Sequence, residues 1–260
     1  MAPLQATYIG GPTTLLQIGG LRLLTDPTFD PAGSEYPTPV YTLRKTQSPA
    51  VDAEALGGVD VILLSHDHHF DNFDRGGRVV ASRTRTVLTT PAGAERLGAG
   101  AHGLAPWQRV ELPLPDGRAL RVTATPARHG PPDGDRGPVT GFVLALADRP
   151  ERGIYVSGDT VWYEGVAEVA RRFRIETAFL FMGAARVREV GPAHLTFTAA
   201  DGIAAARAMP DAVIVPLHYE GWMHFSEGRA DIEHAFAAAG LGSRLQWLPP
   251  GRATAVRLGS

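Results

Sequence analysis

Residues 59–74 read VDVILLSHDHHFDNFD, an apolar run followed by three histidines and three aspartates in a chain that has nine histidines in all. The β-branched and apolar residues of this run predict a buried strand, and the polar cluster begins where that strand ends. In an extended chain His66 and His68 share a face, whereas on a helix they would point apart. The stretch therefore predicts an α/β fold with a polar site at the end of a strand.

Three other apolar runs also lead directly into a residue that can bind a metal. They are VTATPAR before His129, IYVSG before Asp159 and VIVPL before His218. Functional groups often gather where the strands of a sheet give way to loops, so these side chains are expected to converge. The chain has no cysteine, so a metal would be held by His, Asp or Glu, which are ligands for zinc, manganese or iron.

The order of apolar patterns along the chain predicts its architecture. Short strands are expected before residue 26, a long loop at 30–50, more strands at 108–157, and alternating strands and helices afterwards, including strands at 244–249 and 254–258. This order favours an α/β fold with two sheets packed face to face and helices outside each. At 260 residues and 44% hydrophobic, the chain is expected to form a single domain over residues 1–260.

Charge and hydropathy narrow the choice of partners. The formal net charge is -2, with both signs interspersed, so neither a nucleic-acid surface nor a polybasic membrane patch is expected. The first residues lack the pattern of a secretory leader, and no apolar run is long enough to span a bilayer. A cytoplasmic protein that acts on a small molecule is expected, and its oligomeric state is left open.

Four motifs, SHDHHFDNFD, ARHG, SGDT and PLH, resemble in order those of the metallo-β-lactamase superfamily. LLTDP at 23–27 and GPAHLTFTAADGIAA at 191–205 look most similar to the branch that contains L-ascorbate-6-phosphate lactonases and N-acyl-phosphatidylethanolamine phospholipase D. The resemblance implies a four-layer αββα sandwich with a binuclear metal site along one edge of the sheets.

The resemblance also implies roles for individual residues. It makes His66, His68 and His129 ligands of the first metal. Asp159 would bridge the two metals, and Asp71 and His218 would bind the second. Zinc is the expected metal, as one or two ions, with manganese or iron as alternatives. The implied catalytic residues are Asp71 and His194, and the implied reaction is attack by a metal-activated hydroxide on an ester, lactone, amide or phosphoester.

The chain departs from the family's usual pattern, His-x-His-x-Asp-His. It has one additional residue before Asp71, and Asn72 stands in place of the last histidine. One alignment keeps His66 and His68 as ligands, and we prefer it because it leaves two imidazoles on the first metal. An ungapped alignment makes Asp67 and His69 the ligands instead, and His69 is also a candidate substitute at the second site. The second site is therefore expected to be the weaker one.

Several polar residues permit two interpretations. His194 precedes a helix that Thr196 or Thr198 could cap, so it serves either in loop packing or in substrate binding or proton transfer. Asp26 either holds a turn or orients a ligand histidine. Arg186 and Arg188 are either solvated or bind an anionic substrate.

Two other functions are compatible with the same motifs. A similar fold supports redox chemistry when iron occupies both sites. The substitution at Asn72 is also compatible with a metal-binding protein that has no catalytic activity.

Overall fold

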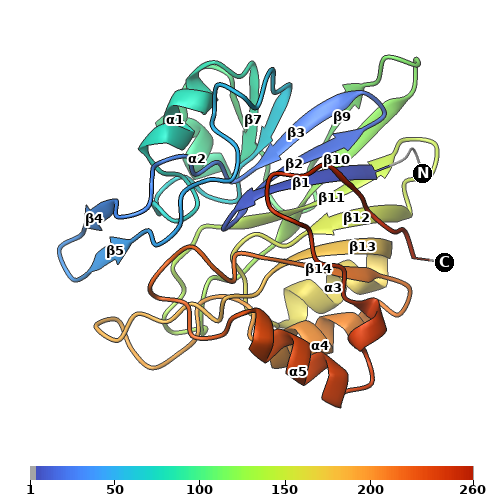
Figure 1. The fold of residues 1–260 in the computed structure, drawn as a ribbon. Helices are drawn as coiled ribbons and strands as arrows, with labels where there is room; N and C mark the ends of the chain where they lie inside the picture. The colour runs from blue at the N-terminus through green and yellow to red at the C-terminus, as the bar shows by residue number, and fades with distance from the viewer. Residues whose placement is uncertain (1–3, 260) are drawn as a thin grey trace.

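Two large β-sheets lie face to face, with helices on the outer face of each, in the computed structural model, which describes residues 4–259 (Figure 1). This arrangement confirms the predicted αββα sandwich.

The first sheet has seven strands in the order β15-β1-β2-β3-β6-β7-β8. Strands β1, β2 and β3 are antiparallel, whereas β3, β6, β7 and β8 run parallel. In chain order the bounds are Leu4–Gly10 (β1), Thr13–Ile18 (β2), Leu21–Thr25 (β3), Val61–Leu63 (β6), Thr86–Thr89 (β7), Ala101–Gly103 (β8) and Thr254–Ala255 (β15).

The second sheet has six strands in the order β14-β13-β12-β11-β10-β9. Strands β9 to β12 are antiparallel, and β12, β13 and β14 are parallel. The bounds are Arg109–Pro113 (β9), Ala119–Pro126 (β10), Thr140–Leu146 (β11), Arg152–Val156 (β12), Arg174–Phe181 (β13) and Val213–Leu217 (β14).

The main core lies between the two sheets, because alternate side chains of each strand point inward. Leu16 and Leu23 of the first sheet are fully buried in the same cluster as Leu144 and Phe179 of the second. Burying apolar surface in this way is the dominant favourable term in folding.

The helices cover the two outer faces of the sandwich (Figure 1). On the first sheet these are α1 (Arg75–Ser82) and α2 (Pro91–Leu97), and on the second α3 (Glu164–Arg172), α4 (Ala199–Ala208) and α5 (Arg229–Ala238). Thr198 caps α4, since its hydroxyl accepts a hydrogen bond from the Asp201 amide at 3.0 Å.

Two local predictions were wrong. Residues 244–249 form no strand: the short 3-10 helix η1 (Gly242–Arg244) is followed by a single bridge from Leu245 to Ile214. The two prolines at 249 and 250 cannot donate ladder hydrogen bonds, which shortens pairing at this edge. The loop at 30–50 also contains a small hairpin of β4 (Glu35–Pro37) and β5 (Thr42–Arg44).

Strand direction brings the carboxyl ends of β3 and β6 in one sheet and of β12, β13 and β14 in the other to one edge. β10 runs in the same direction as β12, because each is antiparallel to β11. Every predicted metal-binding residue follows one of these ends. Among the described residues, no helix is long and apolar enough to cross a bilayer.

Candidate metal centre

Three histidines meet at the edge where the two sheets come together: His66 and His129 are buried, and His69 is half-buried. The Nδ1 atom of His69 lies 3.0 Å from Nε2 of His66 and 3.2 Å from Nε2 of His129. Potential ligand atoms of all three residues lie within 4.8 Å of one another. The spacing fits three donors around one ion, because donors about 2.0–2.1 Å from zinc in a tetrahedral arrangement lie about 3.3 Å apart.

The histidines of this group are held in the neutral form that binds metals. Burial, as the main cause, lowers the pKa of His69 to about 3 and that of His129 to about 4. Burial also lowers the pKa of His66 well below its usual value. Nδ1 of His129 lies 2.8 Å from the carbonyl oxygen of Leu195, a contact that turns Nε2 toward the group.

His68 lies outside this group, although the sequence predicted it as a ligand. Its side chain is 27% exposed, and its Nε2 lies 2.8 Å from the carbonyl oxygen of Arg136. The prediction assumed an extended chain, but β6 ends at Leu63 and the backbone then bends at Ser65, Asp67 and His68. Because of this bend, His66 meets His69, three residues away.

Asp67, a ligand in the ungapped alignment, makes a different contact. Its carboxylate accepts hydrogen bonds from Nε of Arg96 at 2.8 Å and from Nη2 of Arg96 at 2.5 Å. The structure thus brings together one member from each alternative alignment, His66 from the first and His69 from the second.

A second group contains Asp71, Asp159 and His218, all buried, with ligand atoms within 4.8 Å of one another. Nε2 of His218 lies 3.6 Å from an oxygen of each carboxylate. Within residues 4–259, both carboxylate oxygens of Asp159 and both ring nitrogens of His218 lack a hydrogen-bond partner.

These unpaired atoms fit a bound cation. Burial, and next the negative charge of Asp71, raises the pKa of Asp159 well above its usual value. Two buried carboxylates side by side are costly unless a positive charge compensates them. Carboxylate oxygens and a neutral imidazole are ligands that zinc, manganese and iron accept.

Asp26 and Ser65 form a chain of hydrogen-bond contacts that ends at His66 of the first group. The hydroxyl of Ser65 lies 2.6 Å from Oδ2 of Asp26 and 2.8 Å from Nδ1 of His66. Burial raises the pKa of Asp26 to about 7, and hydrogen bonds from Asn72 and Ser65 oppose this rise. Asp26 therefore contacts the histidine through Ser65, which is the orienting role that the sequence allowed.

Asn72 also belongs to this support. Its side-chain nitrogen donates to Oδ2 of Asp26 at 3.0 Å, while its side-chain oxygen is buried and has no partner in the described part of the chain.

The other predicted residues are not members of the two groups. Nδ1 of His194 lies 3.2 Å from the carbonyl oxygen of Ala184, and a catalytic role for His194 stays a prediction. Arg186 and Arg188 are exposed, while Val187 between them is buried.

A cavity opens beside both groups. His69, Asp71 and His129 line it on one side, and most of the remaining lining is apolar or aromatic, including Tyr41, Leu43, Val187 and Leu195. Arg136 also lines the cavity, whereas Arg186 and Arg188 do not.

His224 is a further member of the site that the sequence did not indicate. It lines the same cavity, and its Nε2 lies 3.0 Å from Oδ2 of Asp71. Its position six residues after His218, within the loop between β14 and α5, was the available signal.

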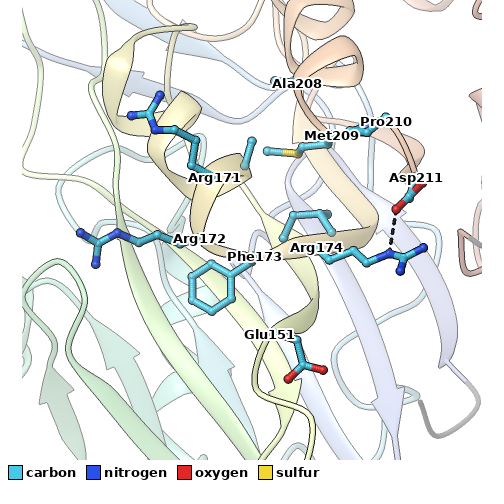
Figure 2. Close-up of a pocket in the computed structure, with 11 residues that line it drawn as sticks. Glu151, Arg171, Arg172, Phe173, Arg174, Ala208, Met209, Pro210 and Asp211 are labelled. Carbon is cyan, nitrogen blue, oxygen red and sulfur yellow. Dashed lines mark ion pairs between the residues drawn. The ribbon is translucent and has the colours of Figure 1, made fainter.

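Another hollow lies at the opposite ends of the strands, where β13 begins (Figure 2). Each of the arginines that line it pairs with another protein group. Arg174 pairs with Asp211 at 2.7 Å, and Arg172 lies 4.0 Å from the ring centroid of Trp107. Among residues 4–259, the two groups of His and Asp side chains that could hold a metal ion lie at the other edge of the sheets.

The fold and the two groups of His and Asp side chains define a protein of the metallo-β-lactamase class. Residues 21–219 match the family model described as the Beta-lactamase superfamily domain, and the chain belongs to this superfamily.

Relatives and solved structures extend this likeness over most of the chain. A UPF0173 metal-dependent hydrolase of Pyrobaculum aerophilum is 25% identical over 222 residues, which cover 83% of this chain and 84% of the relative. The crystal structure of isothiocyanate hydrolase from Delia radicum gut bacteria has a TM-score of 0.82 at 24% identity and covers 97% of this chain and 99% of its own. The crystal structure of a possible metal-dependent hydrolase from Veillonella parvula has a TM-score of 0.83 at 19% identity and covers 98% of this chain and 100% of its own. The two structures share the fold, and the narrower branch within the superfamily stays a prediction.

Proposed function

We propose that this chain is a metal-dependent hydrolase with a binuclear centre that acts on a small molecule carrying an ester, lactone, amide or phosphoester group. The observation that supports this most directly is the pair of adjacent donor groups beside one cavity. The name of the Pyrobaculum relative, a metal-dependent hydrolase, agrees with this proposal.

His66, His69 and His129 would hold the first ion, and Asp71, Asp159 and His218 would hold the second. This set replaces His68 by His69 because of the contacts described above. We keep zinc as the expected metal, with manganese or iron as alternatives. When bound, the ions would supply Lewis acidity and a hydroxide nucleophile near neutral pH.

The protein's own residues contribute orientation and exclusion of water. Leu195 fixes the ring of His129 through its carbonyl, and Ser65 fixes that of His66. Leu43 and Val187 present apolar surface to the cavity, so a substrate with an apolar part would displace water on binding. Arg136 is the cavity-lining cation, and it would meet a phosphate or carboxylate of an anionic substrate.

The test is turnover by purified protein that has been freed of metal and then reloaded with zinc, manganese or iron. The panel should contain a neutral ester, a lactone, an amide, a phosphodiester and, because of the fold neighbour, an isothiocyanate. We expect turnover of at least one substrate that is lost in His129→Ala and after chelation. A di-iron centre with oxidase activity and no hydrolysis would instead favour the redox alternative. No turnover of any substrate with any metal would favour a metal-binding protein without catalytic activity.

A further inference from the structure

His224 lies directly beside the second donor group. Its Nε2 is 3.0 Å from Oδ2 of Asp71, and its side chain is only 11% exposed. Its other ring nitrogen, Nδ1, is buried and has no hydrogen-bond partner among residues 4–259. An imidazole in this position contacts a carboxylate that already belongs to the second group.

His224 and His218 flank the same aromatic ring. The centroid of Phe225 is 4.7 Å from the centroid of each imidazole. His224 also lines the cavity together with His69 and Asp71. It therefore lies at the boundary between the second donor group and the space that a substrate would enter.

The backbone holds His224 in this place from two sides. Its carbonyl accepts a hydrogen bond from the amide of Arg186 at 2.9 Å, and the amide of Met223 donates to the carbonyl of Arg44 at 3.1 Å. Because neighbouring segments fix the main chain, little conformational entropy remains to be lost when the imidazole binds a ligand.

Asn72 contributes no imidazole to the second group. The superfamily pattern has a histidine at this position, but the amide nitrogen of Asn72 is bonded to Asp26. His218 is then the one imidazole in the second group. Two acidic side chains and one imidazole leave room for a further neutral nitrogen donor.

We propose that His224 is a ligand of the second metal and supplies the imidazole that Asn72 does not. The inference rests on the binuclear centre of the proposed function. Nε2 of His224 lies 3.0 Å from Oδ2 of Asp71, so the imidazole stands next to a donor atom of the second group.

The experiment counts metal ions and does not depend on turnover. Metal-free protein is titrated with Zn²⁺ by calorimetry, bound zinc is measured by mass spectrometry, and the visible spectrum is recorded after Co²⁺ loading. The variants are His224→Ala and His224→Gln. The control is His234→Ala, which removes an exposed histidine on α5. Circular dichroism of the metal-free variants checks that each is folded.

We expect the unmutated protein and His234→Ala to bind two ions. His224→Ala and His224→Gln should each keep one tightly bound ion and bind the second ion at least about tenfold more weakly. The visible bands of the Co²⁺-loaded protein should also change. Removing a ligand should lower the affinity for the metal at least as much as removing a residue that supports a ligand. Glutamine can still donate a hydrogen bond to Asp71, so it separates a ligand from a residue that acts through Asp71.

A second ion bound as tightly in both variants as in the unmutated protein, or retained in His224→Gln alone, would overturn the role of His224 and leave the binuclear centre intact. One ion in the unmutated protein would overturn the binuclear centre and this inference together. Two ions without turnover of any substrate would count against the hydrolase, whereas the role of His224 would still be decided by the variants.

Discussion

The Nδ1 atom of His69 lies 3.0 Å from the Nε2 atom of His66. This contact joins residues three apart in the chain, and it exists because the backbone bends after β6 instead of continuing as a strand. His68, between them, points to the carbonyl oxygen of Arg136. The contact is the reason that the proposed first site contains His66 and His69 and not the pair that an extended chain would present.

Replacing His69 by Ala should therefore lower the affinity for the first metal ion at least about tenfold, because a ligand is removed. His68→Ala, its matched control, should change the affinity by less than about threefold, since that side chain is partly exposed and bonds to a backbone oxygen. Calorimetric titration with Zn²⁺ measures both. The reverse order of effects would restore the alignment that pairs His66 with His68.

Asp67→Asn should lower stability without weakening metal binding. The carboxylate is nearly buried and receives two hydrogen bonds from Arg96, and hydrogen bonds to charged groups contribute about 1.5–3 kcal/mol. Urea unfolding of the metal-free protein should show a loss of about 1–3 kcal/mol, while zinc affinity stays the same. Loss of zinc affinity at unchanged stability would instead make Asp67 a ligand.

Asn72→His should raise the affinity for the second metal ion, because imidazole is a better zinc ligand than a neutral amide oxygen. It should also cost about 1 kcal/mol of folding stability, since the hydrogen bond to Asp26 is lost. In the unmutated protein the second ion should bind more weakly than the first. Calorimetry that finds two equally tight sites before mutation would contradict this expectation.

Arg136→Ala should raise KM for an anionic substrate about fivefold, because an exposed ion pair contributes up to about 1 kcal/mol. Arg186→Ala should leave KM unchanged, since Arg186 is exposed and does not line the cavity. The measurement compares an anionic and a neutral substrate that share one leaving group. The same change in KM for both substrates in Arg136→Ala, or no change for either, would remove the anionic-substrate hypothesis.

Lys45→Met should destabilise the fold by about 3–5 kcal/mol, because it leaves the buried carboxylate of Asp74 without its cation. Nζ of Lys45 lies 2.9 Å from Oδ2 of Asp74, and the two side chains are 5% and 0% exposed. The neighbouring Arg44 pairs with Glu35 at an exposed site, so Arg44→Met should cost less than about 1 kcal/mol. Denaturant midpoints compare the two variants, and equal losses would refute the buried-pair explanation.

The sequence by itself determined the layered fold and the edge at which the site forms. Apolar runs of strand length, each ending in a histidine or aspartate, carry this information locally, because a buried strand must end where polar side chains begin. The positions of His129, Asp159 and His218 at the ends of β10, β12 and β14 follow from this pattern. Thr198 as a helix cap is of the same local kind.

Which side chains meet at that edge was decided by the tertiary structure. The bend that brings His69 to His66 begins beside Asp26, which follows β3 and accepts a hydrogen bond from the amide of Ser65 at 2.6 Å. The return of the chain to Asp71 at His224 depends on contacts with Arg44 and Arg186. Loop conformation is set by such partners distant in sequence, and no periodicity within the loop reports them, so the sequence located the site while the packing of the loops selected its members.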